Sequence, residues 1–305
     1  MNTELSVVIP VYKGHLSIGH LVKSLQQELD SLKYEVILVV DGCPEDSENV
    51  CRELARNHEN INFITLRKNF GEFNAVICGL NYIRGRYAVI IDDDFQNPPS
   101  EIIKLYNKAI EGNHDVVYSY YTQKEHSFVR NMGSVMINYL TTYLLKKDKN
   151  LYLSSFKLIS REVVQEIVKY KNPYPYIDGM IFQVTNNIGK VLVEHKERLH
   201  GESNYSARKL ISLFLTILFG YSLIPLRLTL FAGLFSIFFS LGIMALYFLN
   251  IIKEWGSPVV IFMCGVLLCS ISVMGEYIGK TYMNISGLPQ FVIKEKIFHT
   301  HADQQ

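Results

Sequence analysis

The sequence predicts an α/β fold, with a Rossmann-like, mostly parallel sheet in residues 1–207 and two transmembrane helices after it. Two observations carry this prediction. Short apolar runs alternate with segments of helical periodicity between residues 5 and 119, an order typical of parallel sheets with right-handed crossovers. Two long uncharged stretches follow, at 228–252 and 257–275, and each approaches or exceeds the length needed to cross a bilayer.

The individual elements are placed by their periodicity. Strands are expected where short, β-branched, apolar runs lie between turn residues, because strands buried on both faces lack polar alternation. Helices are expected where apolar residues recur every three or four positions, as Ile18, Leu21, Val22 and Leu25 do. These criteria give strands at 5–10, 34–40, 62–66, 87–91 and 116–119, and helices at 17–31, 47–57, 73–83 and from 98 onward.

The carboxyl ends of the predicted strands are the expected place for a ligand site, since open α/β sheets bind ligands there. No G-x-G-x-x-G follows the first strand, so the dinucleotide fingerprint is absent. The fourth strand instead runs directly into Asp92, Asp93 and Asp94. The sequence therefore predicts a site built from carboxylates and loops.

The aspartates suggest a divalent cation site. If the chain stays extended after the strand, Asp92, Asp94 and Gln96 point to the same side. They would offer two carboxylates and an amide oxygen, which are hard ligands suited to Mg²⁺. The alternative is a solvated acidic turn closed by Pro98 and Pro99. We favour the cation site, because clustered carboxylates repel one another without a counter-charge.

The two uncharged stretches predict a transmembrane hairpin at 226–280, with two core helices of a soluble protein as the alternative. Basic residues lie outside both stretches, so the positive-inside rule predicts that the N-terminal domain and the tail at 281–305 face the cytoplasm. Trp255, in the short connector, suits a membrane interface. The apolar periodicity before the hairpin, at 208–225, fits either an amphipathic helix on the membrane surface or a core helix.

Charge and cysteine content narrow the possible partners and the cellular compartment. A formal net charge of +1 gives no argument for nucleic acid as a partner. The five cysteines form no C-x-x-C pair and no zinc-ligand spacing, which favours a reducing compartment. No signal peptide is recognisable at the N-terminus. Together with the hairpin, these features predict a multi-pass protein of the inner (cytoplasmic) membrane.

Several short motifs occur in an order that resembles one family. The chain resembles the GT-A-fold, family 2 inverting glycosyltransferases that load a sugar onto polyprenyl phosphate, such as dolichol-phosphate mannose synthases, bactoprenol glucosyltransferases and undecaprenyl-phosphate aminoarabinose transferases. The resemblance covers nearly the whole chain. Its motifs are Pro10-Val11-Tyr12, Val40-Asp41-Gly42, Arg67-Lys68-Asn69-Phe70-Gly71, Asp92-x-Asp94-x-Gln96-Asn97-Pro98-Pro99, Gly201-Glu202-Ser203-x-Tyr205-Ser206, Pro225-Leu226-Arg227 and Gly275-Glu276-Tyr277-Ile278-Gly279-Lys280.

The resemblance implies roles on the donor side. Asp92 and Asp94 would hold Mg²⁺ or Mn²⁺ against the diphosphate, with Gln96 as a further ligand. Asp93 would turn away from the metal, toward the ribose. The nucleotide base and ribose pocket would include Pro10, Tyr12 and Asp41, although Asp41 can also be a plain turn residue before Gly42. The loop with Asn69 and Gly71 would offer N–H groups to phosphate.

On the acceptor side, the resemblance implies that the phosphate of the lipid faces Arg130, Ser134, Arg198 and Ser203. Each arginine could equally be a surface ion pair. The implied reaction is attack by the lipid phosphate oxygen on the anomeric carbon of a nucleotide sugar, expected to be a UDP-sugar carrying a hexose, with inversion. A homo-oligomer, expected to be a tetramer, is implied as well. The product would serve cell-envelope glycan or lipid modification.

The sequence departs from this family at the acceptor side. No acid occurs between Lys149 and Arg161, where relatives often carry one, and neither Asp148 nor Asp178 is assigned that role. A phosphomonoester is already largely dianionic at neutral pH, so it needs orientation more than it needs a general base. Lys13-Gly14 also stands where relatives place a carboxylate, which leaves recognition of the base open.

Three other interpretations stay open. A processive polysaccharide synthase would share the aspartates but should carry a Gln-x-x-Arg-Trp motif, whereas the single tryptophan is Trp255. The chain could also glycosylate another membrane-surface acceptor, such as a lipid-linked saccharide. A non-catalytic membrane scaffold is the third, and the intact set of Asp92, Asp94 and Gln96 argues against it.

Overall fold

A computed structural model gives the structure for residues 3–43, 46–121, 141–172, 175–196, 214–215, 217–220, 222–249, 251 and 256–299. The chain forms two compact units. The first comprises Met1–Asn204 together with Pro289–Gln305, and the second comprises Tyr205–Leu288. We describe each unit by itself.

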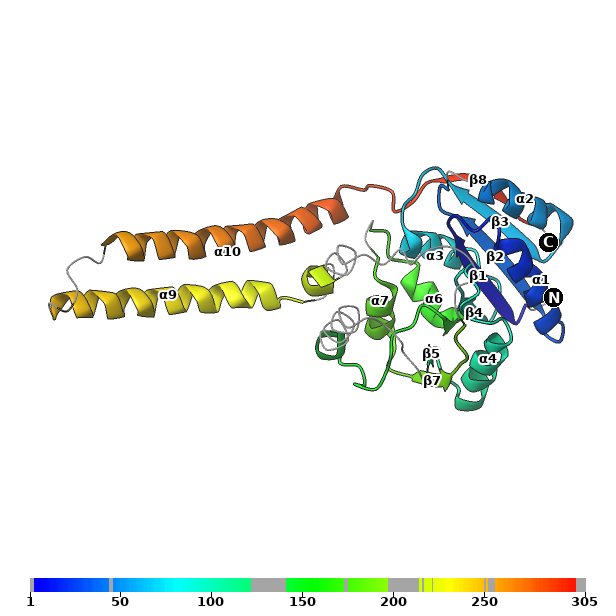
Figure 1. Ribbon diagram of the computed structural model, residues 1–305, viewed down its shortest axis with the longest axis horizontal. Coiled ribbons are helices and arrows are strands. Elements are labelled where there is room, and N and C mark those ends of the chain that lie inside the picture. The colour runs from blue at the N-terminus through cyan, green and yellow to red at the C-terminus, as the bar shows by residue number, and fades with distance from the viewer. Residues whose placement is uncertain are drawn as a thin grey trace. The chain divides into compact units, whose positions relative to one another are not determined.

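The first unit is built on one mixed, mostly parallel sheet, which confirms the predicted fold class (Figure 1). Its strand order is β7-β5-β6-β4-β1-β2-β3-β8. The central strands β4, β1, β2 and β3 are mutually parallel, while β6 and β8 run antiparallel to their neighbours. The strands are β1 (Leu5–Val11), β2 (Tyr34–Val40), β3 (Ile61–Leu66), β4 (Tyr87–Ile90), β5 (Val116–Tyr120), β6 (Lys157–Ser160), β7 (Ile188–Leu192) and β8 (Ile293–Ile297).

Helices cover both faces of this sheet (Figure 1). Alternate residues of β1 point to opposite faces: Val7 and Ile9 pack with α1, α2 and α4, whereas Val8 packs with α3, α6 and α7. All three valine and isoleucine side chains are fully buried, as expected for a central strand of a parallel sheet. The helices are α1 (Ile18–Glu28), α2 (Ser47–Asn57), α3 (Glu72–Leu80), α4 (Glu101–Gly112), α6 (Arg161–Ile167) and α7 (Ile177–Val184).

The last strand, β8, returns to this sheet from the far end of the chain. It pairs antiparallel with β3, and the N–H of Arg67 donates to the carbonyl of Val292 at 2.9 Å. Ion pairs add to the pairing: Arg52 contacts Glu295 at 2.8 Å, and Lys294 contacts Glu48 of α2 at 2.9 Å. The segment after the second long helix therefore belongs to the first unit.

The second unit contains two long apolar helices, α9 (Ile224–Phe248) and α10 (Gly256–Ile285). The most apolar stretches of Ile224–Phe248 and Val259–Ile285 have mean hydropathies of 2.1 and 2.2, and only 6% of each is buried. Core helices of a soluble protein of this hydropathy would be buried. Their length and exposure confirm the prediction of two helices able to span a membrane.

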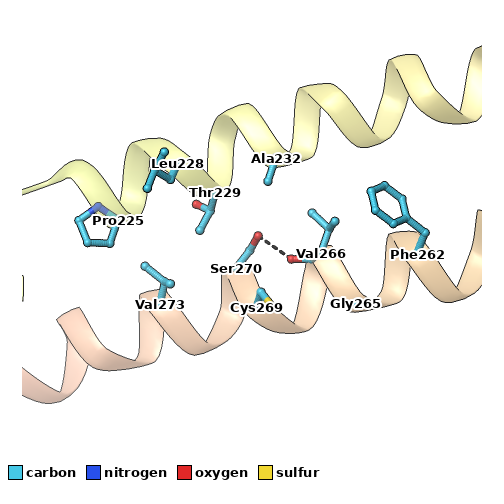
Figure 2. A pocket seen from close by; sticks show the side chains of 10 residues that line it. All are labelled: Pro225, Leu228, Thr229, Ala232, Phe262, Gly265, Val266, Cys269, Ser270 and Val273. Carbon is cyan, nitrogen blue, oxygen red and sulfur yellow. Dashed lines mark hydrogen bonds between the residues drawn. The ribbon is translucent and has the colours of Figure 1, made fainter. Parts of the chain in front are cut away.

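A groove of about 530 Å³ lies between α9 and α10 (Figure 2). Its polar side chains are turned to their own helices: Ser270 Oγ donates to the carbonyl of Val266 and Thr229 Oγ1 to that of Leu226, both at 2.8 Å. Both hydroxyl groups thus donate to carbonyl groups of their own helix, and the groove offers mainly apolar contacts. It is lined by Pro225, Leu228, Thr229, Ala232, Phe262, Gly265, Val266, Cys269, Ser270 and Val273.

Candidate active site

The predicted donor-side residues follow the ends of three parallel strands. Tyr12 comes directly after β1, Asp41 directly after β2, and Asp92 two residues after the end of β4. Because these strands are parallel neighbours in the sheet, their carboxyl ends share one edge. The fold therefore brings these three segments together, as the sequence predicts.

Asp41 holds the loop between β3 and α3. Its Oδ1 accepts from the N–H of Phe70 at 2.7 Å, and its Oδ2 accepts from the N–H of Gly71 at 2.8 Å. Gly42 lets the same loop approach closely, since its φ is +53° and an added Cβ would lie 2.1 Å from the Lys68 carbonyl carbon. Burial, partly offset by the two backbone hydrogen bonds, raises the pKa of Asp41.

This arrangement corrects one expectation about the loop. The N–H of Gly71 is committed to the Asp41 carboxylate and to Asn69 Oδ1, and that of Phe70 is committed to Asp41. The structure thus directs these two groups inward, whereas the resemblance implies that the loop offers its N–H groups to phosphate. A contact between Asn69 and the donor stays a prediction.

Asp93 joins the aspartate turn to the end of β1. Its Oδ2 accepts from the N–H of Tyr12 at 3.2 Å. The carboxylate also lies against Gly14, where an added Cβ would come within 2.2 Å of the same oxygen. This close approach therefore requires glycine at position 14. It gives a structural reason for Gly14 in the Lys13-Gly14 pair that the sequence did not reveal.

The aspartates do not continue the strand, and this corrects the argument from extended alternation. β4 ends at Ile90, and the chain then turns, with Phe95 at a φ of +63°. Asp94 Oδ1 accepts from the N–H of Gln96 at 3.0 Å within this turn. The turn, rather than the pleat of a strand, decides where these side chains point. We refer to residues 92–97 as the aspartate turn.

A second segment, 151–157, supports the turn. Ser155 Oγ donates to Asp92 Oδ2 at 2.8 Å. Lys157, in the same segment, pairs with the buried carboxylate of Asp178, which also accepts from Tyr118 Oη at 2.7 Å. Asp178 is thus engaged in the core and is not placed to activate an acceptor.

Of the other predicted residues, Pro10 is buried in β1 and Tyr12 is 40% exposed. Arg130, Ser134, Arg198 and Ser203 lie outside the described residues, so their roles stay predictions.

A sequence comparison decides the family. The profile described as glycosyl transferase family 2 matches residues 6–168, more than half of the chain. This protein belongs to glycosyl transferase family 2. The match covers the elements from β1 to α6, including the aspartate turn and the Ser155 segment.

Relatives of this family 2 transferase match it along nearly its whole length. It is 29% identical over 303 residues to the uncharacterized glycosyltransferase YkcC of Bacillus subtilis (strain 168), covering 96% of this chain and 94% of that one. It is 28% identical over 314 residues to the undecaprenyl-phosphate 4-deoxy-4-formamido-L-arabinose transferase of Edwardsiella ictaluri (strain 93-146), covering 99% and 96%.

Solved structures share the fold of the first unit. The glucosyl-3-phosphoglycerate synthase of Mycobacterium tuberculosis, in complex with Mn²⁺, UDP-glucose and phosphoglyceric acid, superposes with a TM-score of 0.54 at 18% identity. The superposition covers 70% of this chain and 77% of that one. It supports the GT-A fold expected for the family.

The side chains of the family 2 transferase fit a divalent cation that is shared with substrate. Among the residues described, no group of three or more His, Cys, Asp or Glu is arranged to hold a metal by itself. Asp92 and Asp94 with the Gln96 amide would supply only part of an oxygen shell. Mg²⁺ characteristically takes one or two carboxylates and completes its shell with substrate phosphates and water, and the donor set here suits that pattern.

One further acid lies at this site and no motif signals it. Glu72, the first residue of α3, has its pKa raised to about 7, first by desolvation and then by the negative charge of Asp92, while Lys157 acts in the opposite direction. Part of Glu72 is exposed to solvent, while neighbouring protein atoms desolvate its carboxyl group. A carboxyl group with a raised pKa holds its proton more readily, so Glu72 adds less negative charge beside the aspartate turn than an ordinary glutamate would.

Proposed function

We propose that this protein transfers a hexose-type sugar, with inversion, from a nucleotide sugar to the phosphate of a polyprenyl lipid such as undecaprenyl phosphate. The single observation that carries the proposal is the aspartate turn at the shared strand edge, within a family 2 domain whose chain also bears two membrane-length helices. A relative named as an undecaprenyl-phosphate transferase, matched over 99% of this chain, supports the class of acceptor.

On the donor side, the exposed ring of Tyr12 is available to stack on a base, and Pro10 and Asp41 would complete that pocket. Asp92, Asp94 and Gln96 would hold Mg²⁺ or Mn²⁺ against the diphosphate. The cation would stabilise the charge that develops on the leaving nucleoside diphosphate. The negative charge of the aspartate turn would otherwise repel that leaving group.

On the acceptor side, the lipid phosphate acts as its own nucleophile. Its oxygen forms the new bond to the anomeric carbon while the bond from that carbon to the diphosphate breaks, and the configuration inverts. A dianionic phosphate has no proton to lose in this step, since its second pKa is near 6. The absence of an acid between Lys149 and Arg161 is therefore compatible with the reaction.

The path of the chain supports the proposed location. β8 pairs with β3 after the chain has passed through α9 and α10, so the segments before and after the hairpin lie on the same side of any membrane that it spans. The basic residues outside the two apolar stretches favour the cytoplasmic side. We therefore place the transferase domain and both termini on the cytoplasmic face of the inner membrane.

The proposal is tested by incubating membranes that contain the protein with a panel of radiolabelled UDP-sugars, undecaprenyl phosphate and Mg²⁺ or Mn²⁺. We expect one donor to yield a labelled, acid-labile lipid, and Asp94→Asn to abolish it. The matched control is Glu111→Gln, since Glu111 is exposed on α4 and is expected to leave transfer unchanged. If Asp94→Asn retained transfer as Glu111→Gln does, the assignment of the site would be contradicted.

The same assay separates the other interpretations. Label that appears only when a lipid-linked saccharide is added would indicate that acceptor instead. No label from any donor, together with no donor hydrolysis, would indicate a non-catalytic scaffold. We also expect a homo-oligomer, with a tetramer implied by the resemblance, and crosslinking in intact membranes measures its size.

A further inference from the structure

Three separate segments of the first unit meet at the side chain of Tyr121, the residue that follows β5. Its hydroxyl donates to Asn97 Oδ1 at 2.9 Å, and it lies 3.1 Å from Ser154 Oγ. On another side, the ring of His195 packs against the phenol ring, with 4.3 Å between the centroids and 40° between the ring planes. Tyr121 thus links the aspartate turn, the 151–157 segment and the segment after β7.

Each linked segment in turn contacts a residue assigned to the cation. Next to Ser154, Ser155 Oγ donates to Asp92 Oδ2 at 2.8 Å. Next to His195, the N–H of Lys196 donates to the carbonyl of Gln96 at 2.8 Å. Asp92 and Gln96, near the two ends of the aspartate turn, are therefore both held by segments that Tyr121 joins.

The hydroxyl of Tyr121 is itself held in a defined direction. The N–H of Phe156 donates to Ser154 Oγ, and Ser119 Oγ donates to the carbonyl of Phe156 at 2.7 Å. With these groups satisfied, Ser154 can donate to Tyr121, and Tyr121 donates to Asn97. Ser119, Ser154 and Asn97 are buried, and a buried network of this kind rigidifies what it holds.

The aspartate turn needs such support because of its backbone. Phe95 has a φ of +63°, a left-handed conformation that is unfavourable for a residue with a side chain. It persists only when the surroundings fix it. The Tyr121–Asn97 hydrogen bond acts two residues beyond Phe95, where the turn would otherwise relax.

We propose that Tyr121 is a positioning residue for the cation site, and that its hydroxyl holds the aspartate turn in the conformation that binds the metal–nucleotide. This inference rests on the donor half of the proposed function and is independent of the acceptor. Tyr121 need not touch the substrate. It acts through Asn97 and Ser154 on the geometry of Asp92 and Gln96.

The test is Tyr121→Phe in the full-length protein, which removes the hydroxyl and keeps the ring against His195. Mn²⁺ binding in the presence of UDP is measured from the free Mn²⁺ signal in electron paramagnetic resonance, without acceptor. We expect binding to weaken by about tenfold, the lower end of the effect of losing an outer-shell partner. We also expect the Mn²⁺ concentration for half-maximal donor turnover to rise similarly, and kcat at saturating Mn²⁺ to recover.

Two further variants keep the test decisive. Tyr106→Phe is the matched control, since it makes the same chemical change in a buried tyrosine of α4, and it should leave Mn²⁺ binding unchanged. Ser154→Ala removes the other partner of the hydroxyl and should weaken binding in the same direction, even if Tyr121→Phe folds poorly. Unchanged Mn²⁺ affinity in Tyr121→Phe and Ser154→Ala, or a fall in kcat that saturating Mn²⁺ does not restore, would overturn the inference.

The outcome is separable from that of the proposed function. Weakened Mn²⁺ and UDP binding with no transfer to undecaprenyl phosphate by the wild type would keep the role of Tyr121 and refute the acceptor. Normal transfer by the wild type, with unchanged Mn²⁺ binding in the variants, would support the acceptor and refute the role of Tyr121.

Discussion

Ser155 donates a hydrogen bond from Oγ to Oδ2 of Asp92, at 2.8 Å. The bond joins the segment in which relatives often carry an acid to the first aspartate of the aspartate turn. In the proposed function, this segment would orient a metal ligand instead of supplying a base. We therefore expect its residues to affect the donor and its cation more than the acceptor.

Ser155→Ala is predicted to weaken the cation site. A single hydrogen bond is worth about 1 kcal/mol, or about fivefold in an equilibrium constant, so half-maximal Mn²⁺ should rise by about that factor. Titration of donor hydrolysis with Mn²⁺ measures it. Ser100→Ala is the control, because Ser100 precedes α4 without a side-chain capping bond; an equal change in both variants would refute the role of Ser155.

Gly14→Ala is predicted to damage the site through Asp93. The new Cβ would lie 2.2 Å from Asp93 Oδ2, so the carboxylate must leave the N–H of Tyr12. We expect a lower melting temperature and a raised KM for the donor, measured by thermal unfolding and initial rates.

Gly19→Ala in α1 provides the comparison for Gly14→Ala. An added Cβ there meets nothing within 4 Å, and alanine in place of a helical glycine stabilises by roughly 0.5–1 kcal/mol. If Gly14→Ala were as stable and active as Gly19→Ala, the close approach of Asp93 would be of no consequence.

Asp41→Asn is predicted to loosen the loop before α3. Asparagine replaces one of the two carboxylate oxygens by an NH₂ group, so in the same pose its amide nitrogen would face one of the two donors, Phe70 N–H or Gly71 N–H. Losing such a hydrogen bond to a charged group costs about 1.5–3 kcal/mol. The loss of stability is measured by chemical unfolding, and faster hydrogen exchange at Phe70 and Gly71 should accompany it. Unchanged exchange would contradict the role of Asp41 in holding this loop.

Acid is predicted to weaken the attachment of β8. Hydrogen bonds from Arg52 lower the pKa of Glu295. Burial opposes a similar shift in Glu48, but Lys294 and Arg52 outweigh it and its pKa is lowered as well. A carboxyl group whose pKa is lowered in the folded protein stabilises the fold at pH values above its ordinary pKa of 4.5. This stabilisation is lost as the pH falls through the pKa that the group has in the folded protein.

The acid effect is measured by following hydrogen exchange of β3 and β8 in the full-length protein from pH 7 down through the range below pH 4.5, after correction for the intrinsic rates. Protection should fall once the pH is below the ordinary carboxyl value of 4.5, and it should fall less steeply in Glu295→Gln, which starts from weaker pairing. If protection fell equally steeply with pH in both proteins, the Arg52–Glu295 ion pair would not be responsible for the acid effect.

The sequence was sufficient to predict the elements whose pattern is local. The bounds predicted for β2 and α2, 34–40 and 47–57, are those observed, because a continuous apolar run and a clear helical period mark them. β8 escaped prediction because its sequence, Ile-Lys-Glu-Lys-Ile, looks like a charged tail. Charged side chains are typical of edge strands, and only the pairing with β3 reveals this one.

The site was predictable in the same uneven way. The aspartates after β4 are visible as a motif, but Phe95 breaks the extended geometry from which their direction was inferred. The bonds from Asp41 to the Gly71 loop and from Ser155 to Asp92 join segments that are distant in sequence. No local pattern signals such contacts, and the acid Glu72 was missed for the same reason.

The most direct test of the central claim uses purified protein in lipid nanodiscs. The productive nucleotide sugar, labelled with ¹³C at the anomeric carbon, is supplied with undecaprenyl phosphate and Mn²⁺, and the lipid product is examined by NMR. The account predicts that the anomeric carbon couples to one phosphorus of a monophosphate ester, with inverted configuration. Label found only in free sugar or in a lipid-linked saccharide, or retention of configuration, would contradict it.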